Sequence, residues 1–188
     1  EEIPAIFVRG NHEIRNFHSA ALPSLLDQPG GKTYGAFSWG DTRFVILDCG
    51  EDKPDDHPVY YGLNDFSAFR RQQYDFLQEE MDSREFRRAE CRVLVSHIPL
   101  WGNDDKYRPC SELWTPLLED ARFDDALSGH THRFRYHSTG DASNPFPVCI
   151  GGGPGAYSAT MMVLTKKGKD FSLRVLNTKG EELGEWTL

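Results

Sequence analysis

The sequence predicts an α/β protein with mixed β-sheets, and two patterns indicate this class. In the early half of the chain, short apolar runs of strand length alternate with segments of helical periodicity. The last third consists mostly of strand-like runs joined by tight turns, which is typical of β-hairpins. We therefore expect an α/β core with mixed sheets and not a pure doubly wound fold. The length of 188 residues suits a single domain over residues 1–188.

The first elements combine one buried strand, a short helix and a hairpin. Residues 3–8 are apolar enough for a buried strand. Residues 17–27 mix Ala, Leu and Pro, which predicts a short helix broken at Pro23. Residues 33–39 and 43–47 are strand-like and are separated by a Gly-Asp turn. We therefore expect the last two runs to pair with each other.

The clearest predicted helix covers residues 66–86. It follows residues 48–63, which are rich in Asp, Pro and Gly and are expected to form a surface loop. Asn64 or Asp65 is a candidate cap at its start. The helix is indicated by large apolar side chains at roughly helical spacing. These are Phe66, Phe69, Phe76, Leu77 and Met81.

The middle of the chain contains two further buried strands with a helix between them. Residues 92–95 and 125–127 are the strands, and residues 112–120 are the expected helix. Pro116 lies in the first turn of that helix or kinks it. Residues 101–111 are polar and aromatic without periodicity, which predicts an irregular loop.

The remaining sequence predicts strands joined by turns, with no further helix. Gly151-Gly152-Gly153 is expected to form a turn that lets the backbone pass near the functional site, because the segment lacks the Lys-Ser/Thr of a phosphate-binding loop. The strand-like runs cover residues 134–138, 148–150, 157–165, 171–176 and 185–188.

Composition excludes several classes of function. The chain has 21 Lys and Arg against 29 Asp and Glu, so its net charge is −8. Nucleic-acid binding is disfavoured, because it requires a basic face. No run is long and apolar enough for a membrane helix. The cysteines form no Cys-x-x-Cys pair and are expected to be small buried residues. They lie at Cys49, Cys91, Cys110 and Cys149.

Polar side chains follow three of the predicted strands. Asn11 comes after the first strand, His97 after residues 92–95, and His130 and His132 after residues 125–127. Ligands of α/β sheets gather outside the carboxyl ends of strands, so we expect these four side chains at one edge. If residues 130–132 are extended, the two histidines point to the same side. Neutral imidazole is a common metal ligand, so the pattern predicts a metal site.

These segments resemble the motifs of the calcineurin-like metallophosphoesterases, including the purple acid phosphatase branch. The likeness is carried, in order, by Gly10-Asn11-His12-Glu13, Ser96-His97 and Gly129-His130-Thr131-His132. It extends from Ile3 to about Leu176. The resemblance implies a sandwich of two mixed sheets with flanking helices.

The resemblance also implies a role for each matching residue. Asn11, His97 and His130 would bind one metal of a two-metal site, and His132 would bind the other. His12 would stabilise the substrate phosphate or protonate the leaving group. Glu13 is expected to stand at a helix start or to orient its neighbours, and not to be a catalyst. Histidines outside the motifs are expected to have surface or core roles. These are His18, His57 and His137.

The sequence departs from the family pattern in one important respect. The Asp-x-His and Gly-Asp-x-x-Asp motifs, which belong upstream of Asn11, are absent. We therefore expect residues 1–188 to be the C-terminal portion of an incomplete metallophosphoesterase domain, whose partner would be the missing N-terminal portion. The bridging carboxylate belongs to the absent motifs, so this chain is expected to bind at most one metal, weakly, and to be poorly active or inactive.

The expected reaction is metal-dependent hydrolysis of a small phosphorylated substrate. Two metals about 3.5–4 Å apart activate water and hold the phosphate oxygens. Imidazole and amide ligands without thiolate suit Zn, Mn or Fe. A phosphomonoester is the favoured substrate, and a phosphodiesterase or nuclease of the same family is the alternative. A non-catalytic binding domain is the third possibility. The resemblance allows a secreted or periplasmic location, but the residues themselves assign no compartment.

Overall fold

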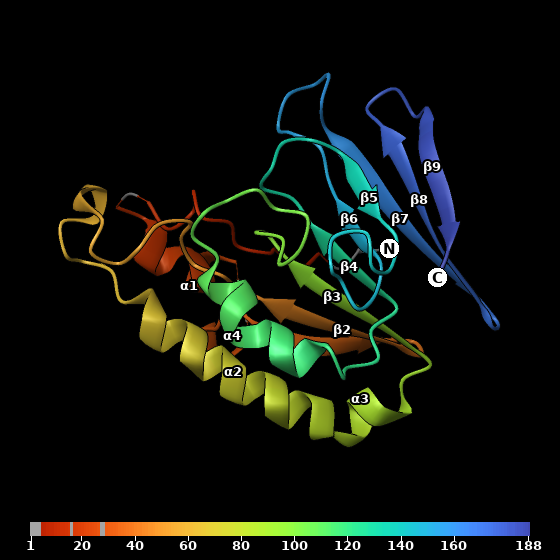
Figure 1. The fold of residues 1–188 in the computed structure, drawn as a ribbon, viewed down its shortest axis with the longest axis horizontal. Helices are drawn as coiled ribbons and strands as arrows, with labels where there is room; N and C mark the ends of the chain where they lie inside the picture. Colours follow the sequence, from red (N-terminus) through yellow and green to blue (C-terminus); the bar gives the residue numbers. More distant parts are fainter. Residues whose placement is uncertain (1–4, 16, 27–28) are drawn as a thin grey trace.

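The computed structural model describes residues 5–15, 17–26 and 29–188. Within these residues the chain forms two sheets and a layer of helices (Figure 1). The larger sheet has the strand order β1-β2-β3-β4-β6-β5. Its strands are β1 (Gly35–Trp39), β2 (Thr42–Leu47), β3 (Cys91–Ser96), β4 (Asp125–Ser128), β5 (Arg135–His137) and β6 (Val148–Ile150).

The larger sheet is mixed, as expected. β2, β3, β4 and β6 are parallel to one another, while β1 and β5 join its two edges in antiparallel orientation. The second sheet is an antiparallel meander in the order β7-β8-β9. Its strands are β7 (Thr160–Lys167), β8 (Asp170–Asn177) and β9 (Glu182–Thr187).

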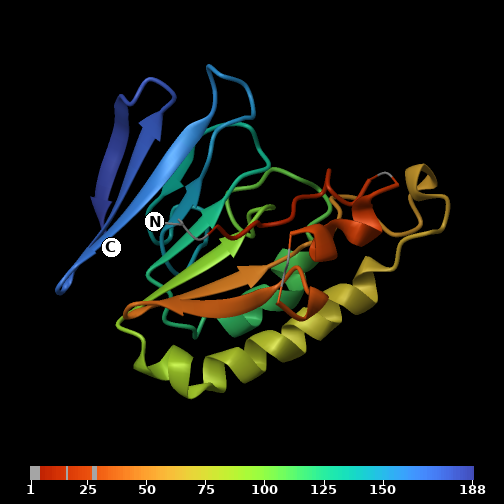
Figure 2. The same ribbon diagram turned by 180° about the vertical axis from the view of Figure 1, so that it is seen from behind.

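Helices cover one face of the larger sheet, and the smaller sheet covers the other (Figures 1 and 2). Strand β3 shows how the sequence produces this arrangement, because successive side chains of a strand point to opposite faces. Leu94 belongs to the cluster that contains Leu77 and Trp114 of the helices. Val93 instead packs with Phe171 of the second sheet. The sandwich with flanking helices is therefore confirmed, but only the larger sheet is mixed, because the smaller one is entirely antiparallel.

The helices differ in detail from the expected ones. The predicted helix over residues 66–86 is two helices, because Ser83 is extended and its side chain caps the second one through the amide of Phe86. Asp65 caps the first, as expected, by accepting from the amide of Ala68 at 3.3 Å. The elements are η1 (Ser19–Ala21), α1 (Leu22–Leu25), η2 (Pro29–Gly31), η3 (Pro58–Tyr60), α2 (Phe66–Asp82), α3 (Arg84–Arg88) and α4 (Pro109–Leu118).

Pro23 does not break the short helix near the start of the chain. It occupies the first turn of α1, where its missing N–H leaves no helical hydrogen bond unmade. Residue 27, the expected end of this helix, lies outside the described residues. Within the described part of the chain, every helix falls short of the length and hydrophobicity that a bilayer crossing demands.

The expected strand over residues 3–8 is the main error in the predicted fold. Residues 5–8 form no strand, and residues 3–4 lie outside the described part. Ile6 and Phe7 are 55% and 41% exposed. The physical reason is that an apolar run becomes a strand only by pairing with another strand, and residues 5–8 join neither edge strand of the larger sheet, β1 or β5.

Candidate metal centre

The carboxyl ends of β3 and β4 bring His97 and His130 together. The two strands are parallel neighbours, and the amide of Gly129 donates to the carbonyl oxygen of His97 at 2.9 Å. The hydroxyls of Ser96 and Ser128 meet at 3.3 Å just before the histidines. The imidazole rings of His97 and His130 then stand edge to face, with centroids 5.5 Å apart. The predicted convergence of these two strand ends is confirmed.

The loop that carries Asn11 reaches the same place without being part of the sheet. A β-carbon added to Gly10 would lie 2.9 Å from the ring of His97, so the backbone of Gly10 contacts this ring closely. The next residue, Asn11, is 1% exposed. Its side-chain oxygen Oδ1 is buried and has no hydrogen-bond partner within the described structure. A buried acceptor without a donor is costly, and a bound cation would satisfy it.

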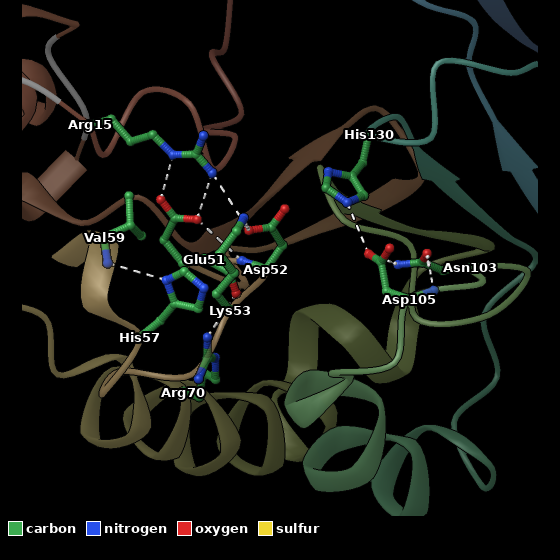
Figure 3. Close-up of polar contacts among 10 residues, drawn as sticks. All are labelled: Arg15, Glu51, Asp52, Lys53, His57, Val59, Arg70, Asn103, Asp105 and His130. Carbon is green, nitrogen blue, oxygen red and sulfur yellow. Dashed lines mark hydrogen bonds and ion pairs between the residues drawn. The ribbon is translucent and has the colours of Figure 1, made fainter.

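Ion pairs with buried carboxylates hold this loop against the segment that follows β2. Nε of Arg9 lies 2.6 Å from Oδ2 of Asp48, and Nε of Arg15 lies 2.8 Å from Oε1 of Glu51. Figure 3 shows the guanidinium of Arg15 over Glu51 and Asp52. Both Asp48 and Glu51 are 1% exposed, so their carboxylates depend on these partners. The loop is thus held by an ion pair before Asn11 in the sequence, at Arg9, and by another after it, at Arg15.

The expected extended conformation of residues 130–132 is wrong. Strand β4 ends at Ser128, and His130 and His132 have φ angles of +68° and +58°. The amide of Thr131 donates to the carbonyl oxygen of Gly129 at 2.7 Å, which closes a tight turn around His130. The rule that alternate side chains share a face therefore does not apply here. His130 is partly buried, whereas His132 is exposed.

His12 and Glu13 have different surroundings. His12 is exposed at a turn in which the amide of Arg15 donates to the carbonyl oxygen of His12 at 3.2 Å. Oε2 of Glu13 accepts from the amide of Gly10 at 2.8 Å. Glu13 therefore orients the backbone next to Asn11, which is the orienting role expected for it.

His97 is held in its neutral form. Burial lowers the pKa of His97 to about 4, and the neighbouring His130, His12 and His132 add to this effect against the opposing charge of Glu13. A neutral imidazole keeps a lone pair for a metal ion near neutral pH.

The residues present fit part of a metal site. Among residues 5–15, 17–26 and 29–188, no three His, Cys, Asp or Glu side chains converge on a point that would hold a metal ion. Two imidazoles converge here, and the loop that carries the unpartnered amide oxygen of Asn11 contacts one of them through Gly10. Nitrogen and oxygen donors without thiolate suit Zn, Mn or Fe. The four free cysteines are buried, as expected, and lie outside this set.

The glycines after β6 lie next to His132. A β-carbon on Gly153 would be 3.1 Å from the β-carbon of His132, and one on Gly152 would overlap the carbonyl oxygen of Ser158 at 1.8 Å. The expected turn that passes near the site is thus present. Glycine is needed here for close backbone approach and not for binding phosphate.

One side chain at this edge was missed by the sequence patterns. Oδ2 of Asp105 lies 3.0 Å from Nε2 of His130 (Figure 3). Asp105 lies in the loop between β3 and α4, where no motif or periodicity singles it out. The remaining histidines lie elsewhere, and His57, for example, caps η3 through the amide of Val59.

The fold and this edge define an α/β sandwich with clustered histidines beyond two parallel strands. The chain belongs to the calcineurin-like phosphoesterase family, whose model matches residues 1–134. It is 25% identical over 141 residues to the serine/threonine-protein phosphatase CPPED1 of Rattus norvegicus, an alignment that covers 71% of this chain and 43% of that protein. The human CPPED1 is 26% identical over 140 residues, or 70% of this chain and 42% of that protein.

A solved structure supports the same fold. The purple acid phosphatase PPD1 from seeds of yellow lupin, Lupinus luteus, superposes with a TM-score of 0.60 and 16% identity, covering 84% of this chain and 32% of that one. At this identity the likeness concerns the fold alone. The chain spans less than half the length of the CPPED1 relatives.

Proposed function

We propose that this chain forms part of a metal-dependent phosphohydrolase that favours phosphomonoesters. The observation that carries the proposal is the pair of rings of His97 and His130. Gly10 contacts the ring of His97, and the next residue, Asn11, has a buried oxygen without a hydrogen-bond partner in the described structure. Membership of the calcineurin-like phosphoesterase family and the likeness to phosphatases support it. The net charge of −8 disfavours a nucleic acid as the substrate.

Each side chain has a distinct proposed role. Asn11, His97 and His130 would hold one metal, and His132 would contribute to a second. Metals of this kind activate water and neutralise charge that spreads over the phosphate oxygens. His12, exposed at the mouth of the site, would give a proton to the leaving oxygen, an effect typically of about 10²–10⁴-fold.

The second metal requires further ligands, and the described residues contain no group of three His, Cys, Asp or Glu side chains that would hold an ion. We propose that the chain alone binds at most one ion weakly and has little activity. A longer gene product that carries Asp-x-His and Gly-Asp-x-x-Asp motifs would complete the bridge between two ions. The N-terminal portion that carries them is therefore the proposed partner of this chain.

The test compares p-nitrophenyl phosphate with bis(p-nitrophenyl) phosphate, using the full gene product loaded with Zn, Mn or Fe. We expect faster turnover of the monoester and loss of turnover in His97→Ala and in His130→Ala. His57→Ala, which removes a histidine outside the site, is the matched control and should keep full activity. Full activity in either site variant would remove these histidines from the mechanism, and preference for the diester would reassign the substrate class.

A further inference from the structure

The carboxylate of Asp105 lies against His130 but belongs to none of the family motifs. The contact joins Oδ2 of Asp105 to Nε2 of His130 at 3.0 Å, as Figure 3 shows. The side chain of His130 is 13% exposed and that of Asp105 is 38% exposed. The two residues come from separate segments, one after β3 and one after β4. Their contact is thus a tertiary one, made where the proposed metal site is formed.

Asn103 fixes the direction of this carboxylate. The backbone amide of Asp105 donates to Oδ1 of Asn103 at 3.0 Å, and Nδ2 of Asn103 donates to Oδ2 of Asp105 at 2.9 Å. A backbone N–H can only donate, so the first bond determines which end of the Asn103 amide is oxygen. Asn103 is itself 9% exposed. The oxygen that faces His130 is therefore held by a second, buried side chain.

The loop that carries Asp105 is anchored by its first residues. Trp101 is 6% exposed and packs edge to face on Phe146, with ring centroids 5.3 Å apart. Gly102 has a φ of +70°, and a β-carbon there would lie 2.4 Å from Nε2 of His137. The conformation just before Asn103 is therefore restricted to glycine. This anchoring makes the approach of Asp105 to His130 a property of the packed structure.

We propose that Asp105 is a positioning residue that selects the tautomer of His130. An ionised carboxylate can only accept, so Nε2 of a neutral His130 must donate and Nδ1 must keep the lone pair. Figure 3 shows the second ring nitrogen of His130 on the side away from Asp105. Histidines that bind metals commonly donate their other N–H to a carboxylate in this way. The inference rests on the proposed metal site and adds to it a residue that determines which nitrogen binds.

The first test measures the tautomer in the metal-free chain by ¹⁵N NMR at pH 8. We expect His130 to be mainly in the Nε2–H form, and Asp105→Ala to give a mixture of both forms. Asp104→Ala is the matched control, because Asp104 lies next in the chain but is 90% exposed and faces Arg135 at 3.6 Å. An unchanged tautomer in Asp105→Ala, or an equal change in Asp104→Ala, would overturn the proposal.

The second test measures zinc affinity of the same chains by competition with a chelating dye. Asp105→Ala should weaken binding by about 10–100-fold, and Asp105→Asn by less, because its amide oxygen still accepts from Nε2. Asp104→Asn should bind as the unmodified chain does. Unchanged or tighter binding in Asp105→Asn and Asp105→Ala would overturn the proposal. If Asp105→Ala fails to fold, Asp105→Leu, which also removes the acceptor, replaces it in both tests.

The two proposals fail in different ways. A full gene product, loaded with Zn, Mn or Fe, that hydrolyses neither the monoester nor the diester would overturn the proposed function, and that result involves no variant of Asp105. The tautomer of His130 is measured without metal and therefore decides the role of Asp105 independently.

Discussion

The rings of His97 and His130 stand edge to face with their centroids 5.5 Å apart, although the two residues are 33 positions apart in the sequence. A backbone hydrogen bond from the amide of Gly129 to the carbonyl oxygen of His97 holds the ends of the two strands next to each other. The pairing of β3 with β4 therefore brings together two imidazoles that are far apart in the sequence.

Asn11 should be more important for metal binding than for stability. Its Oδ1 is buried without a donor, so Asn11→Leu should leave the free energy of unfolding of the metal-free chain unchanged or raise it by about 1 kcal/mol. The same change should weaken zinc binding at least about tenfold, since it removes a ligand. Urea unfolding and zinc titration of the same sample measure both effects.

Asn144 provides the control for that experiment. It is 2% exposed, and its side chain accepts from the amide of Ala142 and donates to the carbonyl oxygens of Ser138 and Phe146. Asn144→Leu should therefore lower the free energy of unfolding by about 2–4 kcal/mol. Equal destabilisation by Asn11→Leu and Asn144→Leu would show that Asn11 is an ordinary structural residue.

His97 should make the metal-free chain less stable in acid. Its pKa is about 4 in the folded chain against an ordinary value of 6.5, so the unfolded state binds the proton more readily between these values. The free energy of unfolding should fall as the pH drops from about 6.5 to about 4, by at most about 3 kcal/mol, and this contribution should level off below. Comparing His97→Asn with the unmodified chain in chelator isolates the effect, and parallel pH profiles would contradict it.

Asp125 should have the opposite pH dependence. It is fully buried at the start of β4, and burial raises its pKa from 3.8 to about 8. The folded chain therefore holds the proton between these values, and the contribution to stability is lost as the pH rises from about 4 to about 8. Asp125→Asn should be more stable than the unmodified chain by about 2–4 kcal/mol at pH 8 and similar to it at pH 4. Thermal unfolding at the two pH values measures this, and a constant difference between them would refute the assignment.

Gly152 should tolerate no side chain. A β-carbon there would overlap the carbonyl oxygen of Ser158, so Gly152→Ala must displace the backbone beside His132. We expect a loss of about 2–4 kcal/mol in unfolding free energy. Gly35→Ala is the control, because a β-carbon at Gly35 meets nothing within 4 Å. Similar stability of the two variants would show that the close approach is not needed.

The parts of the fold that were predicted depend on local patterns. The cap at Asp65, the hairpin of β1 and β2 and the short buried strand β6 follow from residue type and spacing over a few positions. Residues 5–8 were assigned wrongly because an apolar run becomes a strand only where its backbone pairs with a neighbouring strand, and this run pairs with none in the described sheets. Sequence spacing alone does not reveal which edges are already paired.

In the candidate site, too, local sequence patterns predicted some features, whereas others depend on tertiary contacts. Asn11, His97 and His130 were predicted as candidate ligands because each belongs to a motif that directly follows an apolar run. The left-handed turn at His130 was missed, since non-glycine residues seldom adopt a positive φ. Asp105 was missed because its contact with His130 is created by the folding of an irregular loop. A tertiary contact of this kind produces no periodic pattern in the sequence.

Zinc titration of the 188-residue chain, with the metal content checked by elemental analysis, is the most direct test of the proposed centre. The account predicts one weakly bound ion per chain, with affinity at least about tenfold lower in His97→Ala and His130→Ala and unchanged in His57→Ala. Two tightly held ions per chain, or binding that survives the loss of both His97 and His130, would contradict it.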